Sequence, residues 1–299
     1  MKKLKFSIFG NCQSKALAEV LLENPDFAAR WEWTPVTMAH QLTPELIPSM
    51  HNTFKELDLL IYQPFKGRGI RAHSSDELLK QLPSRAKAIC IPIMYFDGYF
   101  PQLGALPGVQ TPLNRVHDYL IVYFYLRGKS ISQTIDSLQH PDLFKKRYSK
   151  KLFRANIAEL RKREKKHRMG ITISSFIEEF ARKHLLFHQV NHPTKALFQH
   201  IANQLFEQVG VSSPFELEWG NKGPLSAVIC PPLKSLYQYN QCDFDISFDT
   251  YIVFQERLSQ SEVVNRMYCY FSKVGPETLK ANLDQRKKSV ISQINRTFR

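Results

Sequence analysis

The first hundred residues alternate between short apolar runs and amphipathic stretches. Apolar runs at residues 4–9, 57–62 and 88–93 predict buried strands, and residues 31–38 predict a weaker strand. One amphipathic helix is predicted directly after the first strand, and another at residues 74–82, where a serine can cap its start. Strands that alternate with helices at this spacing are typical of an α/β fold with a parallel, doubly wound sheet.

The middle of the chain has the periodicity of helices. Helices are predicted at residues 116–126, 130–138, 144–167 and 174–186. Together they indicate a helical insertion at about residues 113–186. A loop at residues 187–194 and an amphipathic helix at 195–208 follow.

Ser212-Ser213-Pro214 predicts a turn that ends the preceding helix, and the remaining sequence is mostly helical in character. We therefore predict an α/β catalytic core at residues 1–211, which includes the insertion, and a mostly helical C-terminal appendage at residues 212–299.

Composition places the chain among globular proteins. Its 299 residues are 43% hydrophobic and 23% charged, which excludes wholesale disorder and a disulfide-stapled miniprotein. Five dispersed cysteines form no Cys-x-x-Cys pair, which argues against a zinc site and suits reduced thiols. The apolar run at residues 119–126 is less than half a membrane span. We expect a cytoplasmic protein, with peripheral attachment to the inner membrane left open.

The positive charge is concentrated in one segment. The formal charge is +14, and residues 145–168 hold twelve Lys/Arg against two Glu. A solvated helical face is the simplest interpretation. An anionic membrane surface, an acidic polysaccharide or a nucleic acid are the functional alternatives. Nucleic acid is the least favoured partner, because the segment has few aromatic residues for base stacking.

The turn Gly10-Asn11-Cys12-Gln13 joins the first strand to a helix. Glycine permits a tight backbone there, and a thiol at a helix N-terminus feels a dipole that lowers its pKa. Free N–H groups of the first helical turn could also hold an oxyanion. Cys12 is therefore a candidate nucleophile, and the alternative is a small buried cysteine at a tight turn.

A second candidate group follows much later, in the loop from Gln189 to Thr194. Pro193 can start the next helix, which holds the imidazole of His192 on a loop above the sheet. There it could act as a general base, oriented by Gln189 or Asn191. The alternative is an ordinary loop histidine. His117 is a reserve candidate for the base.

A basic, glycine-containing loop follows the predicted strand that ends at Gln63. Lys66, Arg68 and Arg71 lie on it, and the intervening glycines let the backbone approach a phosphate. A solvated basic loop is the alternative. The amide of Gln63 could donate to an oxyanion or simply support the turn.

Aromatic residues gather in the loop at residues 93–101. Tyr95, Phe96, Tyr99 and Phe100 could stack on a sugar or an adenine, or they could be part of the core. Arg115, with its neighbour Asn114, opens the helical insertion and could face the same cleft.

An early strand-end nucleophile with a late His-Pro before a helix resembles the SGNH hydrolase pattern. Cys12 stands at the nucleophile position, His192 at the histidine, and Gln189 where that family has an aspartate. A glutamine cannot supply the charge that stabilises imidazolium. A thiol needs less activation than a hydroxyl, so the weaker orienting group is chemically tolerable.

Four motifs in order resemble the WcbI-type capsular polysaccharide biosynthesis family over about residues 1–210. They are the Gly-Asn-Cys-Gln turn, Tyr62-Gln63-Pro64, the aromatic loop and His192-Pro193-Thr194. The resemblance implies coenzyme A binding and acetyl transfer from acetyl-CoA to a sugar of a surface polysaccharide. The expected cofactor contacts are Gly10, Asn11, Gln13, Lys66, Arg68, Arg71, Tyr95 and Arg115.

Three functions remain open from the sequence. The first is a coenzyme A-dependent acyltransferase that acts on a glycan acceptor, either through an acyl-enzyme on Cys12 or by direct transfer. The second is an SGNH-like esterase or thioesterase that uses the same residues with water as acceptor. The third is a non-catalytic protein that docks through the basic segment on an anionic surface.

Overall fold

The computed structural model describes residues 2–105, 111, 113, 116–281 and 285–295. Two compact units share the chain, and each is built from three stretches. The first unit comprises Met1–Met94, Glu159–Ile177 and Pro193–Leu225, and the second comprises Tyr95–Ala158, Glu178–His192 and Ser226–Arg299. This division does not follow the boundary predicted between residues 211 and 212.

A four-stranded parallel sheet forms the centre of the first unit, in the order β2-β1-β3-β4. The strands are β1 (Leu4–Phe9), β2 (Trp31–Trp33), β3 (Leu59–Tyr62) and β4 (Lys87–Cys90). The predicted α/β class with a parallel, doubly wound sheet is confirmed. The strand predicted at residues 31–38 ends early, at Trp33.

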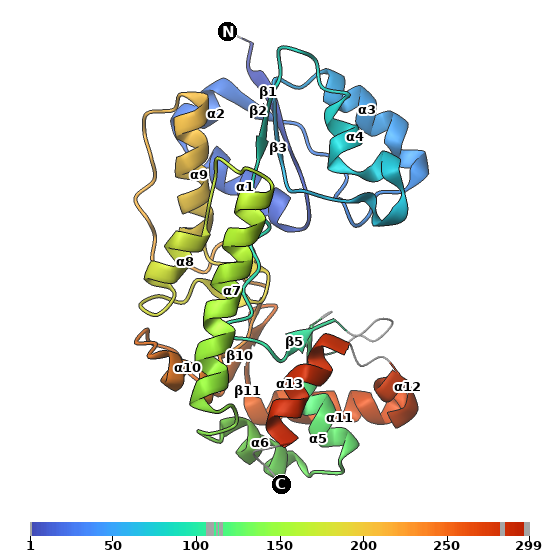
Figure 1. Ribbon diagram of the computed structural model, residues 1–299, viewed down its shortest axis with the longest axis vertical. Helices are drawn as coiled ribbons and strands as arrows, with labels where there is room; N and C mark the ends of the chain where they lie inside the picture. Colours follow the sequence, from blue (N-terminus) through green and yellow to red (C-terminus); the bar gives the residue numbers. More distant parts are fainter. Residues whose placement is uncertain (1, 106–110, 112, 114–115, 282–284, 296–299) are drawn as a thin grey trace. The chain divides into compact units, whose positions relative to one another are not determined.

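Helices cover both faces of this sheet (Figure 1). They are α1 (Gln13–Leu22), α2 (Pro25–Arg30), α3 (Ile47–Lys55), α4 (Ser75–Leu79) and α9 (Lys195–Val209). Phe27 of α2 packs edge-on against Phe6 of β1 and also contacts Phe206 of α9. On the other face, Phe54 of α3 packs against Phe9 of β1. Apolar burial on both faces explains why the strands are continuous apolar runs.

Local signals set the ends of several helices. Ser74 caps α4 as predicted, since its side chain accepts a hydrogen bond from the N–H of Glu77 at 3.3 Å. The helix predicted there is shorter and ends at Leu79. The helix α3 was not predicted, and two residues, Met50 and Phe54, carry its buried face.

Two helices contribute residues to both units, because the boundary between the units falls within each of them. They are α7 (Lys146–Lys166) and α8 (Ser174–Phe180). In the first unit, the buried carboxyl group of Glu164 on α7 accepts hydrogen bonds from the N–H groups of Ile173 and Ser174, at 2.7 and 2.9 Å. One acidic side chain thus caps the start of α8.

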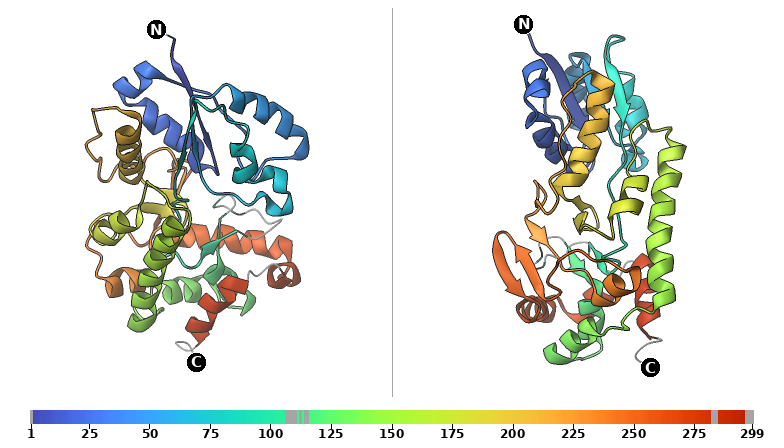
Figure 2. Two further views of the ribbon diagram at one scale, coloured as in Figure 1. Left: turned by 45° about the horizontal axis from the view of Figure 1, so that its top comes forward. Right: turned by 90° about the vertical axis from the view of Figure 1, so that its left-hand side faces the viewer.

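Short strands and helices make up the second unit. Two pairs of strands are β5 (Leu103–Gly104) with β6 (His117–Asp118), and β7 (Phe187–Gln189) with β8 (His192–Pro193), of which Pro193 already belongs to the first unit. A three-stranded antiparallel sheet contains β9 (Val228–Ile229), β10 (Thr250–Val253) and β11 (Glu256–Ser259). The β10–β11 hairpin is orange in Figure 2.

The helices of the second unit confirm the helical character predicted for the insertion and for the C-terminal region. They are α5 (Tyr119–Leu126), α6 (Ile131–Gln139), α10 (Lys234–Asn240), α11 (Gln260–Val274), α12 (Pro276–Ala281) and α13 (Gln285–Asn295), with the first part of α7. The helix predicted at residues 174–186 stops at Phe180, and β7 follows. Among the described helices, none combines the length and the apolar character that crossing a membrane requires.

Candidate functional site

The sheet of the first unit has a topological switch point between β1 and β3. The chain goes from β1 to β2 on one side, whereas β3 and β4 lie on the other side. Parallel sheets bind ligands beyond the carboxyl ends of their strands at such a point. The Gly-Asn-Cys-Gln turn follows β1 and Gln63 follows β3. The structure therefore brings these two predicted groups together at the carboxyl ends of the strands, which form one edge of the sheet.

The turn closes tightly because Gly10 has no side chain. A Cβ atom at this position would overlap the side-chain oxygen of Gln63 and the hydroxyl of Ser14. With glycine there, the Oε1 atom of Gln63 accepts a hydrogen bond from the N–H of Asn11 at 3.0 Å. Gly10 is thus needed for the close approach of a neighbouring strand's side chain.

Two buried glutamines connect the ends of three strands. The amide of Gln63 donates to Oε1 of Gln13 at 2.7 Å and to the carbonyl of Pro92 at 3.4 Å. Gln13 in turn donates to the carbonyl of Met94 at 2.6 Å and accepts from its N–H at 3.2 Å. Because Pro92 and Met94 follow β4, this network fixes the edge at which β1, β3 and β4 end.

These contacts correct the roles predicted for both glutamines. Gln13 and Gln63 are 1% and 2% exposed, and their amide N–H groups donate to protein atoms. We therefore assign them a positioning role, in place of the cofactor contact predicted for Gln13 and the oxyanion contact predicted for Gln63. The supporting role considered for Gln63 is the one its contacts favour.

Asn11 organises the first turn of α1. Its side-chain oxygen accepts from the N–H of Gln13 at 2.9 Å, and its carbonyl accepts from the N–H of Ser14 at 3.0 Å. The N–H groups of Gln13 and Ser14 were expected among the free donors for an oxyanion. Asn11 uses them to hold the start of the helix.

Cys12 occupies the N-cap position of α1 and is half-buried. Burial raises the pKa of its thiol, and hydrogen bonds from the N–H groups of Cys12 and Gln13 lower the pKa by less. The prediction that the helix start lowers the thiol pKa is therefore wrong for this structure, because desolvation outweighs the backbone donors. At neutral pH the group is a thiol that requires a base to become a nucleophile.

The basic loop after Gln63 lies on the same edge. It contains two short 3₁₀ turns, Gly67–Gly69 and Arg71–His73. Its backbone turns through positive φ at Gly67, Arg68 and Gly69, with values of 77°, 49° and 90°. Arg71 pairs with Glu77 at 2.7 Å, so part of its charge is compensated. Exposed Lys66 and Arg68 remain the stronger candidates for phosphate contacts.

A small cavity lies beside the residues that follow β3 and β4. Its volume is about 110 Å³, and it is lined by apolar residues that include Pro64 and Pro92, together with Arg163 and His167. All of the lining residues belong to the first unit. The sequence did not single out this group, since Arg163 and His167 appear there only as members of the basic helix.

The predicted base, His192, and its orienting group, Gln189, both belong to the second unit. Gln189 ends β7, His192 begins β8, and a two-residue turn joins them. Gln189 is fully buried and donates its amide N–H to the carbonyl of Val228 on β9 at 2.8 Å. That contact anchors the hairpin. Asn191 is then the other group predicted to orient the half-buried His192.

Cys12 belongs to the first unit and His192 to the second. Their approach to one substrate stays a prediction. The reserve base His117 is fully buried on β6, which argues against direct contact with a substrate. Arg115, with Asn114, lies outside the described residues.

Most of the aromatic loop belongs to the core. Phe96, Tyr99 and Phe100 are at most 1% exposed, and Phe96 stacks on Phe187 with ring centroids 5.7 Å apart. Of the two alternatives that the sequence left open for these three rings, their burial therefore favours the core over a stacking surface for a ligand. Tyr95 is half-buried and remains the candidate of the four for a ligand contact.

Comparison with known proteins adds a family to this geometry. The model of the family described as "Polysaccharide biosynthesis enzyme WcbI" matches residues 5–214. No curated protein matches the chain.

A solved structure superposes with a TM-score of 0.83 over 100% of both chains, at 23% sequence identity. It is described as WcbI, a novel polysaccharide biosynthesis enzyme, in its native form without a disulfide bond between COA and a cysteine of that protein. This likeness shows a shared fold, while the layout of an SGNH hydrolase stays a prediction. Because the family model covers more than half of its length, the chain belongs to the WcbI family of polysaccharide biosynthesis enzymes.

Proposed function

We propose that this enzyme is a coenzyme A-dependent acyltransferase, which moves an acetyl group from acetyl-CoA to a sugar of a surface polysaccharide. The observation that carries the proposal is the position of Cys12, a half-buried thiol at the start of α1, beside the switch point of a parallel sheet. The similar WcbI structure is described as native protein without a disulfide bond between COA and a cysteine of that protein. The description thus names coenzyme A and a cysteine as the two partners of that bond, which would bring their sulfurs within about 2 Å of each other.

Cys12 is the cysteine of this chain that best fits such a contact. Cys230 and Cys242 are buried, and burial raises the pKa of both thiols, to about 12 for Cys242. Cys90 lies within β4 and shares a hydrogen bond with Tyr62. Cys269 is exposed on α11 of the second unit. Cys12 alone follows a strand of the parallel sheet and begins a helix.

The neighbouring features suit the parts of acetyl-CoA. Lys66 and Arg68 supply exposed positive charge for the diphosphate and the ribose phosphate. The cavity of about 110 Å³ at the ends of β3 and β4 suits a short acyl group better than a long chain. Arg163 and His167 in its lining offer donors to a polar acceptor.

Two routes, one covalent and one direct, can move the acetyl group from coenzyme A to the sugar. In the covalent route, a base takes the proton of Cys12, and the sulfur attacks the thioester carbonyl. The bond to the sulfur of coenzyme A breaks, and that sulfur regains a proton. A sugar hydroxyl then attacks the acyl-enzyme, loses its proton to the base, and releases Cys12. In the direct route the sugar hydroxyl attacks acetyl-CoA itself, and Cys12 lines the site.

The raised pKa of Cys12 shapes the covalent route. The thiol remains neutral until a base is in place, which limits unproductive attack on the thioester. His192 is the base that the sequence predicts. The buried glutamine network holds the turn in one geometry, so that little reorganisation is needed during the reaction.

Mass spectrometry after mixing with acetyl-CoA tests the proposal and separates the routes. We expect an acetyl adduct on Cys12 in the wild type and none in Cys12→Ser, with Cys269→Ser as a control that keeps the adduct. Acetylated glycan formed without an adduct would support direct transfer. The absence of acetyl transfer to any glycan and of an adduct would overturn the assignment as an acyltransferase.

Calorimetry with coenzyme A tests the cofactor separately. The double variant Lys66→Ala/Arg68→Ala should raise the Kd about ten-fold, because it removes contacts worth about 1.5 kcal/mol or more to a charged group. Lys55→Ala removes an exposed cation at the end of α3 and should leave the Kd unchanged. No heat from the wild type would remove coenzyme A from the proposal.

A further inference from the structure

The first part of α7 carries a charge that the proposed cofactor site does not use. Residues 145–158 contain six Lys/Arg and no Asp or Glu. The buried face of this part is made by Phe153 and Ile157, so the cations lie on its other faces. All of these residues belong to the second unit.

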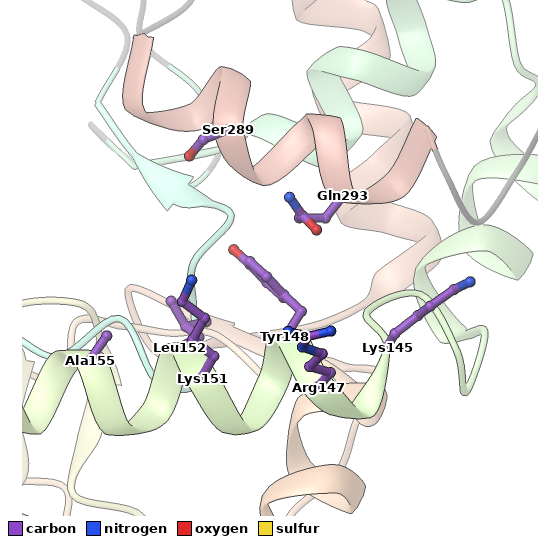
Figure 3. Close-up of a pocket in the computed structure, with 8 residues that line it drawn as sticks. All are labelled: Lys145, Arg147, Tyr148, Lys151, Leu152, Ala155, Ser289 and Gln293. Carbon is purple, nitrogen blue, oxygen red and sulfur yellow. The ribbon is translucent and has the colours of Figure 1, made fainter.

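A groove runs between α7 and α13 at this charged face (Figure 3). Its volume is about 760 Å³, and its cations are Lys145, Arg147 and Lys151. Ser289 and Gln293 of α13 line the opposite wall, and none of the lining residues that the structure describes is acidic. On α7, Arg147 and Lys151 also line a second hollow of about 570 Å³, together with Arg154.

The cations of the groove lack carboxylate partners in the described part of the chain. No salt bridge is formed there by Lys145, Arg147 or Lys151, whereas Arg163 further along α7 pairs with Glu159 at 3.1 Å. The groove cations also lie at or near the N-terminus of α7, where the helix dipole is already positive, and the first turn holds no acidic residue. An anion bound in the groove would relieve this repulsion.

The remaining lining fits a sugar chain. Tyr148 stacks on Phe144 with ring centroids 5.1 Å apart, which holds its phenol in place, and the ring extends from α7 toward α13 (Figure 3). A fixed aromatic ring can pack against a sugar ring, and the hydroxyl of Ser289 and the amide of Gln293 can bond to sugar hydroxyls.

We propose that this groove binds an anionic stretch of a polysaccharide, a chain whose sugars carry carboxylate or phosphate groups. The inference rests on the proposed function, since such a chain would be the acceptor or its extension. A membrane surface fits less well, because peripheral helices insert large apolar residues. The large apolar side chains exposed in the described residues are Leu4, Leu46, Ile70, Trp219 and Phe254, and none lies on α7 or α13.

Fluorescence anisotropy on the full chain tests the proposal, with a labelled oligogalacturonate as the carboxylated probe and a neutral maltooligosaccharide of equal length. The groove variant is Lys145→Ala/Arg147→Ala/Lys151→Ala. The matched control is Lys162→Ala/Lys165→Ala/Lys166→Ala, which removes the same charge from the same helix outside the groove. We expect the charged probe to bind the wild type at least ten-fold more tightly than the neutral one. The groove variant should lose about ten-fold in affinity, and the control less than two-fold.

Two further measurements keep the result interpretable. Tyr148→Ala removes no charge, so weaker binding of oligogalacturonate by this variant supports a sugar contact. Equal losses from the groove and control variants, or tighter binding to phosphatidylglycerol vesicles than to oligogalacturonate, would overturn the proposal. Calorimetry with coenzyme A on the groove variant separates the two hypotheses, because an intact cofactor response with no oligosaccharide binding rejects the groove alone.

Discussion

Hydrogen bonds from two neutral amides, rather than ion pairs, fix the surroundings of Cys12. Gln13 and Gln63 link the ends of three strands through buried hydrogen bonds, and Gly10 leaves the space in which they meet. The sequence identified the turn and the two strand ends, because a buried strand followed by Gly-Asn-Cys-Gln is a local pattern. It could not show which way the glutamine amides point, since that depends on the side chains of Gln13 and Gln63 meeting the main chain of Met94.

Substitution of Gly10 tests this packing. In Gly10→Ala the new methyl group overlaps the side chains of Gln63 and Ser14, so the turn or the network must shift. We expect the free energy of unfolding to fall by about 1–3 kcal/mol in urea denaturation. Gly170→Ala is a matched control, because its methyl group meets only the flexible end of Gln208 and should change stability by less than about 0.5 kcal/mol. Equal effects of the two substitutions would contradict the assigned role of Gly10.

The ionisation of Cys12 gives a second prediction at this scale. Because burial raises the pKa of its thiol, the thiolate should appear only at a pH above the range of an ordinary cysteine. The rate of alkylation by iodoacetamide, followed by mass spectrometry of the peptide that contains Cys12, should therefore rise with pH. Its midpoint should lie above that of free N-acetylcysteine. A midpoint below that of the free thiol would restore the original expectation of a helix-activated thiolate.

Long helices were predicted more accurately than short strands. The helix expected at residues 144–167 is found at Lys146–Lys166, since its buried residues recur at helical spacing over about four turns. The β10–β11 hairpin was not predicted. Phe254 and Gln255 form its two-residue turn with φ values of 48° and 75°, so the asparagine and glycine that usually mark such a turn are missing.

The two acidic residues of the basic segment should differ sharply in their effect on stability. Glu164 is buried and accepts hydrogen bonds from the N–H groups of Ile173 and Ser174, whereas exposed Glu159 pairs only with Arg163. Glu164→Ala leaves buried donors without partners and should lower the free energy of unfolding by about 2 kcal/mol or more. Glu159→Ala should cost about 0.5 kcal/mol or less. Thermal or urea denaturation of both variants measures the difference, and similar losses would show that Glu164 does not cap α8.

At the scale of the whole molecule, neither compact unit is a continuous stretch of sequence. Each gathers three stretches, so a division at one linker near residue 211 could not describe them. Periodicity and composition report on neighbours along the chain, and they contain little information about which distant stretches pack together. The fold class could be predicted from the sequence, because the repeated strand–helix units of the first hundred residues are local features.

The predicted partnership of Cys12 and His192 also belongs to this scale. If both act in one reaction, Cys12→Ser and His192→Ala should each lower the rate of acetyl transfer strongly. The rate of the double variant should then be close to that of the less active single variant. Steady-state transfer assays with acetyl-CoA and a glycan acceptor measure this non-additivity. Losses that multiply would indicate that the two residues act independently.

The close approach of Gln63 to Gly10 links two positions 53 residues apart in the sequence. The space that a methyl group would fill at one position is taken by the amide of the other, so neither can change freely. In relatives with alanine in place of this glycine, we expect a shorter side chain at the end of the third strand. Such paired replacements would record, across the family, a steric constraint that a single chain shows only once.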